Sequence, residues 1–202
     1  MKKLLVIALV SLMATSAFAQ PMDLDTDMMG VYFDAAATQN YRADSVGPFD
    51  VYFCLTNPSA AMIGGVEFGY ALTYDMAALF RSAEVLHNSA LQLGGSADFN
   101  AGDYVLGYPA PVPVSASGSN VIVTWTVSTF APTINMAFHM VGPTTVNSIP
   151  GYFGPVYLDG LLETISLGYS TADGSNSATI GLIEAPVAIE SASFGTVKSL
   201  FR

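Results

Sequence analysis

Residues 121–128 read VIVTWTVS, and the period of two in this run sets the fold class. Four apolar residues alternate with four others: Val121, Val123, Trp125 and Val127 with Ile122, Thr124, Thr126 and Ser128. Successive side chains of a strand point to opposite faces, so the first set predicts a buried face. The turn residues Gly-Ser-Asn at 118–120 predict where the strand begins.

The same period recurs along the chain. It is clear in residues 51–56, 66–73 and 134–141, and weaker in residues 30–34, 80–86, 102–108, 155–158, 163–169 and 178–183. Clusters of Gly, Pro, Asn and Asp separate the runs, as turns do between short strands. No linker or repeat divides the chain, so we expect one all-β domain at residues 20–185. We predict a single antiparallel β-sandwich of about nine strands, immunoglobulin-like or jelly-roll-like.

One segment departs from this period. Residues 75–84 are rich in helix formers, and their apolar members follow an i, i+3, i+4, i+7 stripe: Met76, Leu79, Phe80 and Ala83. Residues 80–86 also fit a strand. The sequence therefore leaves open a short helix near 76–84 or a strand that starts at Phe80.

The first 19 residues have the three parts of a signal peptide. Lys2 and Lys3 precede an apolar stretch at 4–13, and Ala17, Phe18 and Ala19 form a small-x-small cleavage site. The apolar stretch is shorter than the roughly 20 residues that span a bilayer. We expect Sec-type export and a mature chain without a transmembrane helix. Its expected location is extracellular, cell-surface or periplasmic.

The charge balance is strongly acidic. The chain has 6 Lys+Arg against 16 Asp+Glu. Its charged fraction is 11%, where soluble domains average about 25%. Lys2 and Lys3 are removed with the signal peptide. The mature chain then has four Lys or Arg residues and 16 Asp or Glu residues, which gives a net charge of −12. This excludes a nucleic-acid partner, which requires a basic surface. A hydrophobic fraction of 51% excludes a disordered chain.

The residues of catalysis are scarce. His87 and His139 are the only histidines, Cys54 is the only cysteine, and no nucleophile elbow, zinc motif or phosphate-binding loop occurs. A pair of carboxylates could serve a glycosidase, but the sequence singles out no pair. We therefore predict that the protein is not an enzyme, and that it needs no cofactor other than, in one hypothesis, calcium.

That hypothesis rests on the spacing of four acids near the N-terminus: Asp23, Asp25, Asp27 and Asp34. Calcium-binding loops place oxygen ligands at alternate positions and a further acid at position twelve, and this spacing is met. The glycine of the sixth position is missing, because Met28 stands there. The other interpretation is a solvated acidic arm.

Three aromatic residues in a Pro/Gly-rich segment suggest a second kind of site. Tyr152, Phe153 and Tyr157 are close in sequence, and aromatic rings on an exposed loop can stack on sugar rings. The other interpretation is that these rings close one end of the sandwich.

The C-terminal tail, residues 186–202, differs in charge from the rest. Lys198 and Arg202 are half of the mature cations, and Phe194, Val197 and Phe201 fit one face of a helix. We expect either an element docked on the domain or a sorting peptide.

Residues 49–58, FDVYFCLTNP, followed by GGVEF at 64–68, resemble the opening of cohesin-like sandwiches. Residues 148–151 and 194–202 are similar to segments of uncharacterised exported bacterial proteins in which a short basic-aromatic end follows a β-sandwich. The first resemblance implies a nine-stranded sandwich with a binding face and no catalysis. It transfers no functional residue, because no position matches a defined contact motif.

We therefore expect a secreted, non-catalytic binding or adhesion module for an unknown protein or glycan. An apolar, aromatic-rich surface suits such a role. Two alternatives stay open: a structural subunit of an extracellular assembly, and a small outer-membrane β-barrel. Against the barrel, prolines and paired glycines cut the runs below the 9–11 residues of a membrane strand.

Overall fold

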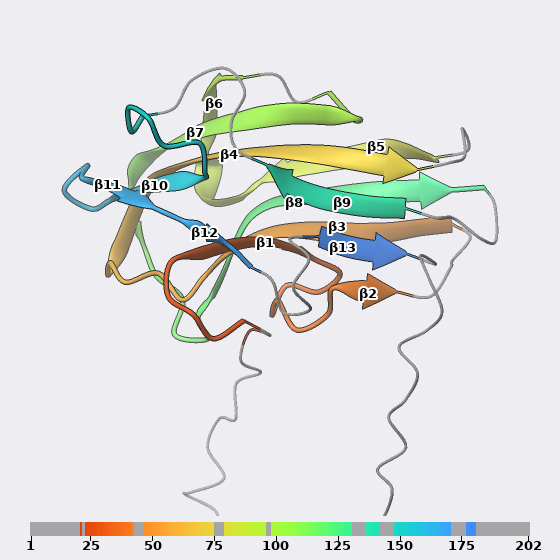
Figure 1. Cartoon of the computed structure of the whole chain (residues 1–202), viewed down its shortest axis with the longest axis horizontal. Helices are drawn as coiled ribbons and strands as arrows, with labels where there is room; N and C mark the ends of the chain where they lie inside the picture. Colours follow the sequence, from red (N-terminus) through yellow and green to blue (C-terminus); the bar gives the residue numbers. More distant parts are fainter. Residues whose placement is uncertain are drawn as a thin grey trace, which may run out of the picture.

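The computed structural model describes residues 21, 23–42, 47–74, 79–95, 98–130, 136–141, 148–170 and 177–180. The signal peptide at 1–19, residues 181–185 of the predicted domain and the tail at 186–202 lie outside the described residues. The described chain forms two stacked β-sheets with one short 3-10 turn (Figure 1). No helix of the described part is long and apolar enough to cross a membrane.

The first sheet has five strands in the order β12-β1-β3-β8-β5. Their bounds are Gly168–Tyr169, Met28–Tyr32, Gly47–Thr56, Ser119–Thr129 and Leu79–Leu86. All pairs are antiparallel except β1 with β12. Strand β8, which contains the VIVTWTVS run, lies between β3 and β5 and is therefore paired on both edges.

The second sheet is built on β4, Met62–Tyr74. One edge of β4 pairs with β7, Ala101–Pro113, which pairs in turn with β6, Leu91–Gly94. The other edge pairs with β10, Val156–Asp159, over its first half and with β9, Met136–Val141, over its second. The remaining strands are β11, Thr164–Ser166; β13, Ser177–Ile180; and β2, Tyr41–Arg42. The 3-10 turn η1, His87–Ser89, leads from β5 in one sheet to β6 in the other.

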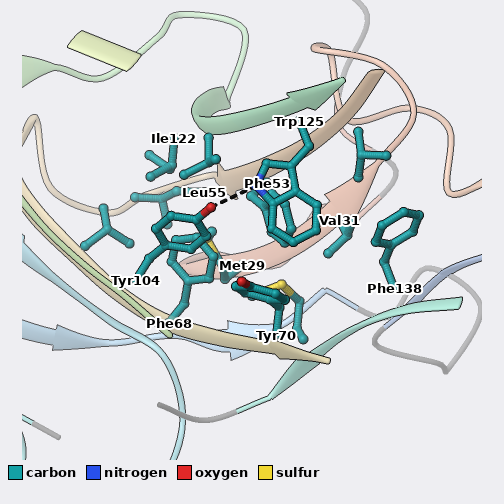
Figure 2. Packing of buried hydrophobic residues seen from close by; sticks show 14 of the residues in the cluster. Met29, Val31, Phe53, Leu55, Phe68, Tyr70, Tyr104, Ile122, Trp125 and Phe138 are labelled. Atoms are coloured by element: carbon teal, nitrogen blue, oxygen red, sulfur yellow. Dashed lines mark hydrogen bonds between the residues drawn. The ribbon is translucent and has the colours of Figure 1, made fainter. Parts of the chain in front are cut away.

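The core between the sheets is aromatic (Figure 2). Phe53 on β3 contacts the rings of four residues from both sheets: Phe68, Tyr70, Tyr104 and Trp125. The Trp125 indole N–H donates a hydrogen bond of 2.8 Å to the Tyr104 hydroxyl, so the largest core ring leaves no buried donor unpaired. Burial of these rings is the main favourable contribution to folding.

The fold class is confirmed: apart from η1, the regular structure of the described residues is all β, and the strands form a sandwich of two sheets. The described residues contain 13 strands, where about nine were predicted, because several are pieces of two to four residues. The helix considered near 76–84 is wrong for residues 79–84, which belong to β5. Pairing with β8 along one edge, together with the burial of Leu79, outweighs the helical propensity of that segment.

A β-bulge changes which residues of β8 face the core. Phe53 pairs with Val123 but Cys54 pairs with Val121, so Ile122 is an extra residue on β8. Ile122 is buried in the main core beside Val123. Val121 instead packs on a second small cluster of Tyr32, Ala37 and Cys54. The alternation predicted for residues 123–127 is confirmed, whereas Val121 and Ile122 exchange faces.

Candidate protein-binding face

Strand β4 positions the candidate site because it is covered on both sides. Val66, Phe68, Tyr70 and Leu72 point into the core. Glu67 lies between two of them and therefore faces away from the core, toward the outer face of the second sheet. Glu67 is nevertheless only 4% exposed, so the outer face of β4 is hollowed and overhung by its neighbours.

The hollow is a groove of about 230 Å³. Its lining comes from four strands and one loop residue: Gly65 and Glu67 on β4, Val105 and Gly107 on β7, Leu93 on β6, Val156 and Leu158 on β10, and Ser148. The lining is apolar except around Glu67 and Ser148. This combination of apolar walls and one acid is typical of a recognition site rather than of an ordinary solvated sheet face.

Two glycines keep the groove open. A Cβ on Gly65 would lie 2.6 Å from the backbone oxygen of Leu106, which cannot move without disturbing the sheet. A Cβ on Gly107 would lie 2.7 Å from Leu93 Cδ1, so Leu93 folds over this glycine. The close approach, and not an unusual backbone angle, is the reason for glycine at both positions.

The Glu67 carboxylate is only half satisfied. Its Oε2 accepts a hydrogen bond of 3.1 Å from the Ser148 backbone N–H. Its Oε1 is buried and has no hydrogen-bond partner among the residues that the structure describes. A buried carboxylate oxygen without a donor costs free energy, so a donor brought by a partner would bind favourably at this point.

Exposed leucines border the groove. Leu91 and Leu93 on β6 are 58% and 67% exposed. Leu93 lines the groove and is the extra residue of a β-bulge, and Leu91 lies beyond the groove on the same strand. Strand β6 pairs only with β7 among the described residues, so its other edge presents unpaired backbone groups. The leucines and this free strand edge extend the apolar surface beyond the groove.

The four aspartates of the calcium hypothesis do not form one cluster. Among the described residues, no group of three or more His, Cys, Asp or Glu side chains could hold a metal ion. Asp27 Oδ1 accepts bonds from the Tyr157 hydroxyl at 2.9 Å and the Ser59 N–H at 2.7 Å. Asp34 accepts bonds from the N–H groups of Thr38 and Gln39 within its own turn. Asp23 accepts a bond from the Asp25 N–H at 3.0 Å. Calcium binding stays a prediction without a preformed site in this structure.

The three aromatics of the proposed patch separate in the structure. Phe153 is 81% exposed, whereas Tyr157 is fully buried in the core and bonded to Asp27. Tyr152 is half-buried, and its hydroxyl donates to the backbone oxygen of Leu167. The interpretation of Tyr157 as part of an exposed patch is therefore wrong, because it is an inward residue of β10. Phe153 is the one fully exposed ring of the three.

Sequence reasoning missed the groove. The available signal was Gly65-x-Glu67-x-Gly69, in which an acid and two glycines alternate with large apolar residues. That pattern places Glu67 on the outer face but does not show that the face is covered. The cover comes from β6 and β10, which lie far from β4 in the sequence.

Comparisons with known proteins bear on the fold. No protein-family model matches the chain, and no curated protein is significantly similar to it. Among solved structures, a non-cellulosomal cohesin from the archaeon Archaeoglobus fulgidus superposes with a TM-score of 0.50. The match covers 79% of this chain and 93% of the cohesin at 7% identity.

The fold is cohesin-like. Two further cohesin modules give TM-scores of 0.48: the sixth cohesin of scaffoldin B from Acetivibrio cellulolyticus, solved with a dockerin, and the cohesin module of a family 33 glycoside hydrolase from Clostridium perfringens. They are 12% and 8% identical to this chain over 79% and 78% of its length, and are covered completely. Identities this low say nothing about the ligand, so the function of this cohesin-like chain has to be argued from its own surface.

Proposed function

We propose that this chain is an exported, non-catalytic binding module and that a protein partner docks on the groove face. The observation that carries the proposal is the buried Glu67 Oε1 without a donor, in a groove bordered by exposed leucines. We do not propose catalysis, because the two histidines lie on different elements, His87 in η1 and His139 in β9. His87 bonds Thr124 at 2.8 Å, and His139 lies in β9 opposite Ala71.

The groove also defines the chemistry of the partner. We expect an apolar segment that places one lysine or arginine side chain against Glu67 and packs on Leu91 and Leu93. A cationic group supplies the missing N–H donor and pairs with the carboxylate in a weakly hydrated setting. The net charge of −12 after signal cleavage would also speed the approach of a basic partner.

Photo-crosslinking in the native host tests this proposal. A photoreactive amino acid replaces Leu93, and a matched control replaces Leu24, which is 71% exposed in the N-terminal arm. We expect a covalent adduct of one defined mass at position 93 and none at position 24. Substitution E67Q removes the charge at nearly constant size and should weaken the adduct at 93 by roughly tenfold, as for one charge-assisted hydrogen bond. Equal labelling at both positions, or no effect of E67Q, would contradict the proposal.

A structural subunit is the second candidate function. The free edge of β6 and its exposed leucines favour it, because such edges pair with strands of other chains. The same crosslink separates the two candidates. An adduct of twice the protein mass, with peptides from this chain alone, indicates self-assembly, and an adduct with another polypeptide indicates a binding module.

Export is a further part of the proposal, and it is supported by the leader sequence. Cleavage after Ala19 would release a chain whose N-terminus is Gln20. Mass spectrometry of the protein from fractionated native cells tests both cleavage and location. An uncleaved chain in the cytoplasmic fraction would contradict export and leave the binding face unaffected.

A further inference from the structure

A second pocket lies at one end of the sandwich, separate from the groove. It has a volume of about 260 Å³ and is formed by η1, the end of β7, the start of β8 and Ile63 of β4. Its polar lining residues are His87, Asn88, Ser115, Ser119 and Asn120. Its apolar lining includes Val112 and Pro113. It shares no residue with the groove.

The pocket is polar but uncharged. No Asp, Glu, Lys or Arg is among its described lining residues. His87 is neutral at neutral pH, because burial lowers the pKa of its imidazole below the usual 6.5. A charged ligand would lose hydration here without gaining a counter-charge. The lining therefore fits a neutral molecule that makes hydrogen bonds.

The polar walls are held in place by hydrogen bonds to the scaffold. Asn120 Oδ1 accepts a bond of 2.7 Å from the Ser115 N–H. Ser119 Oγ donates to the Ala35 backbone oxygen at 2.8 Å. His87 Nε2 bonds the Thr124 hydroxyl at 2.8 Å. A site whose polar groups are fixed before binding loses little entropy when a ligand arrives.

The backbone of η1 shapes one side of the pocket. Asn88 and Ser89 have φ angles of 55° and 57°, in the left-handed region that non-glycine residues rarely adopt. The Asn88 side chain is exposed and lies in the pocket lining. Two consecutive residues in this conformation are a sparsely populated arrangement, and such arrangements cluster at binding sites.

The hydroxyl group of Tyr108, which lines the pocket, is unsatisfied among the described residues. Tyr108 is 9% exposed, and its buried hydroxyl has no partner in the described part of the chain. The other buried tyrosine hydroxyls, those of Tyr32, Tyr70, Tyr104 and Tyr157, all have partners. A ligand hydroxyl that reaches Tyr108 would remove this penalty.

We propose that this pocket binds one neutral, hydroxyl-rich ring, of the kind found as a single sugar unit of a glycan or as a free cyclic polyol. Hydroxyl groups supply both donors and acceptors to Tyr108 and Asn88. The apolar ring face packs on Val112 and Pro113. A volume of about 260 Å³ lies just below the usual range of small-molecule sites, about 300–1,000 Å³, which restricts the ligand to one ring.

Binding measurements on the mature protein test the proposal. The probes are neutral methyl hexosides, myo-inositol as the free polyol, and glucuronate and glucosamine as charged analogues. We expect saturable binding of at least one neutral probe with a Kd in roughly the millimolar range, and none of the charged analogues. Preference for a hexoside over inositol indicates a glycan unit, and the reverse indicates a free polyol. Failure of every neutral probe at roughly 50 mM would overturn the proposal.

Two variants connect binding to the pocket. Y108F removes only the hydroxyl and should weaken binding by about fivefold, the value of one hydrogen bond. N88G removes the amide side chain, and glycine adopts the left-handed backbone of this position without strain. We expect it to weaken binding by a similar factor. Y169F, a half-buried tyrosine outside the pocket lining, is the control and should bind as the parent does.

Folding of the variants is checked by thermal unfolding without sugar. Y108F should unfold at the temperature of the parent or above it, because its hydroxyl has no partner to lose. Unchanged affinity in Y108F, or a crystal of the protein soaked in the probe in which an ordered water alone bonds Tyr108, would overturn the inference. The inference does not rest on the groove, so a groove substitution such as L93S should leave sugar binding unchanged.

Discussion

Two tyrosines of β7 differ in the hydrogen bonding of their hydroxyl groups. Tyr104 and Tyr108 are four residues apart on the same strand, and both lie in the core. The Tyr104 hydroxyl accepts the Trp125 indole N–H at 2.8 Å and donates to Glu84 Oε2 at 2.5 Å. The Tyr108 hydroxyl has no partner among the described residues. The same substitution at the two positions therefore has opposite expected effects.

Tyr104→Phe should lower the free energy of unfolding by about 1–3 kcal/mol, because it leaves the buried Trp125 N–H without an acceptor. Tyr108→Phe should leave this free energy unchanged or raise it. Urea unfolding followed by Trp125 fluorescence measures both variants. Equal losses in the two variants would contradict the predicted difference between the paired hydroxyl of Tyr104 and the unpaired hydroxyl of Tyr108.

At the scale of the element, β4 is unusual because both of its faces are covered. Its inward residues pack on the aromatic core, and its outward residues line the groove between β7 and β10. A strand in this position tolerates little added volume on either face. The four residues of the nearby strand β6 are all exposed, so this strand tolerates more added side-chain volume.

A pair of glycines tests this difference between strands. Gly65→Ala should lower the free energy of unfolding by about 1–3 kcal/mol, since its Cβ would lie 2.6 Å from the Leu106 backbone oxygen. Gly94→Ala in β6 is the matched control, because its Cβ would meet nothing closer than 3.9 Å. We expect Gly94→Ala to be neutral or slightly stabilising in urea unfolding. A neutral Gly65→Ala would mean that β4 can shift within its sheet.

At the scale of the whole molecule, buried phenols and a buried thiol set the alkaline limit of stability. Burial raises the pKa of Tyr32 to about 12 and that of Tyr108 to about 12. Burial also raises the pKa of Tyr70 and Tyr104, and that of Cys54 to about 12. These groups stay protonated in the folded chain at a pH where they ionise in the unfolded chain.

The sign of the pH effect follows from this difference. Between the unfolded and folded pKa values the unfolded chain binds fewer protons, so stability decreases as pH rises. We expect full stability below about pH 8 and a progressive loss above it, because an unfolded cysteine ionises near about 8.5 and an unfolded tyrosine near about 10. Urea midpoints between about pH 8 and about pH 11, with tyrosinate absorbance as the second signal, measure the loss. A midpoint that does not change over this range would contradict burial of these groups.

The prediction of the fold was accurate where neighbouring residues carry the information. Val123, Trp125 and Val127 face the core as predicted, because alternation along a strand is a local property. The exchange of Val121 and Ile122 was not predictable, since it depends on where β3 meets β8. Residues 80–84 fit both the predicted helix near 76–84 and the predicted strand at 80–86, and the pairing of β5 with β8 selected the strand.

The candidate sites were less predictable than the fold. The acids and aromatics that sequence spacing grouped lie apart, because each bonds a different neighbour: Asp27 bonds Tyr157 and Ser59, and Asp34 caps its own turn. Glu67 and Tyr108 were not singled out. Their importance comes from an unpaired buried oxygen, and pairing depends on which strands lie next to them.

The sequence alone establishes the all-β class, the acidic charge and the residue types available for chemistry. These follow from composition and from a period of two, which a strand displays whatever its neighbours are. The pairing of the strands, the bulge in β8, and the two hollows at Glu67 and Tyr108 are properties of the folded chain. They depend on contacts between residues far apart in sequence, because the packing of neighbouring strands determines which polar atoms are buried and which are satisfied.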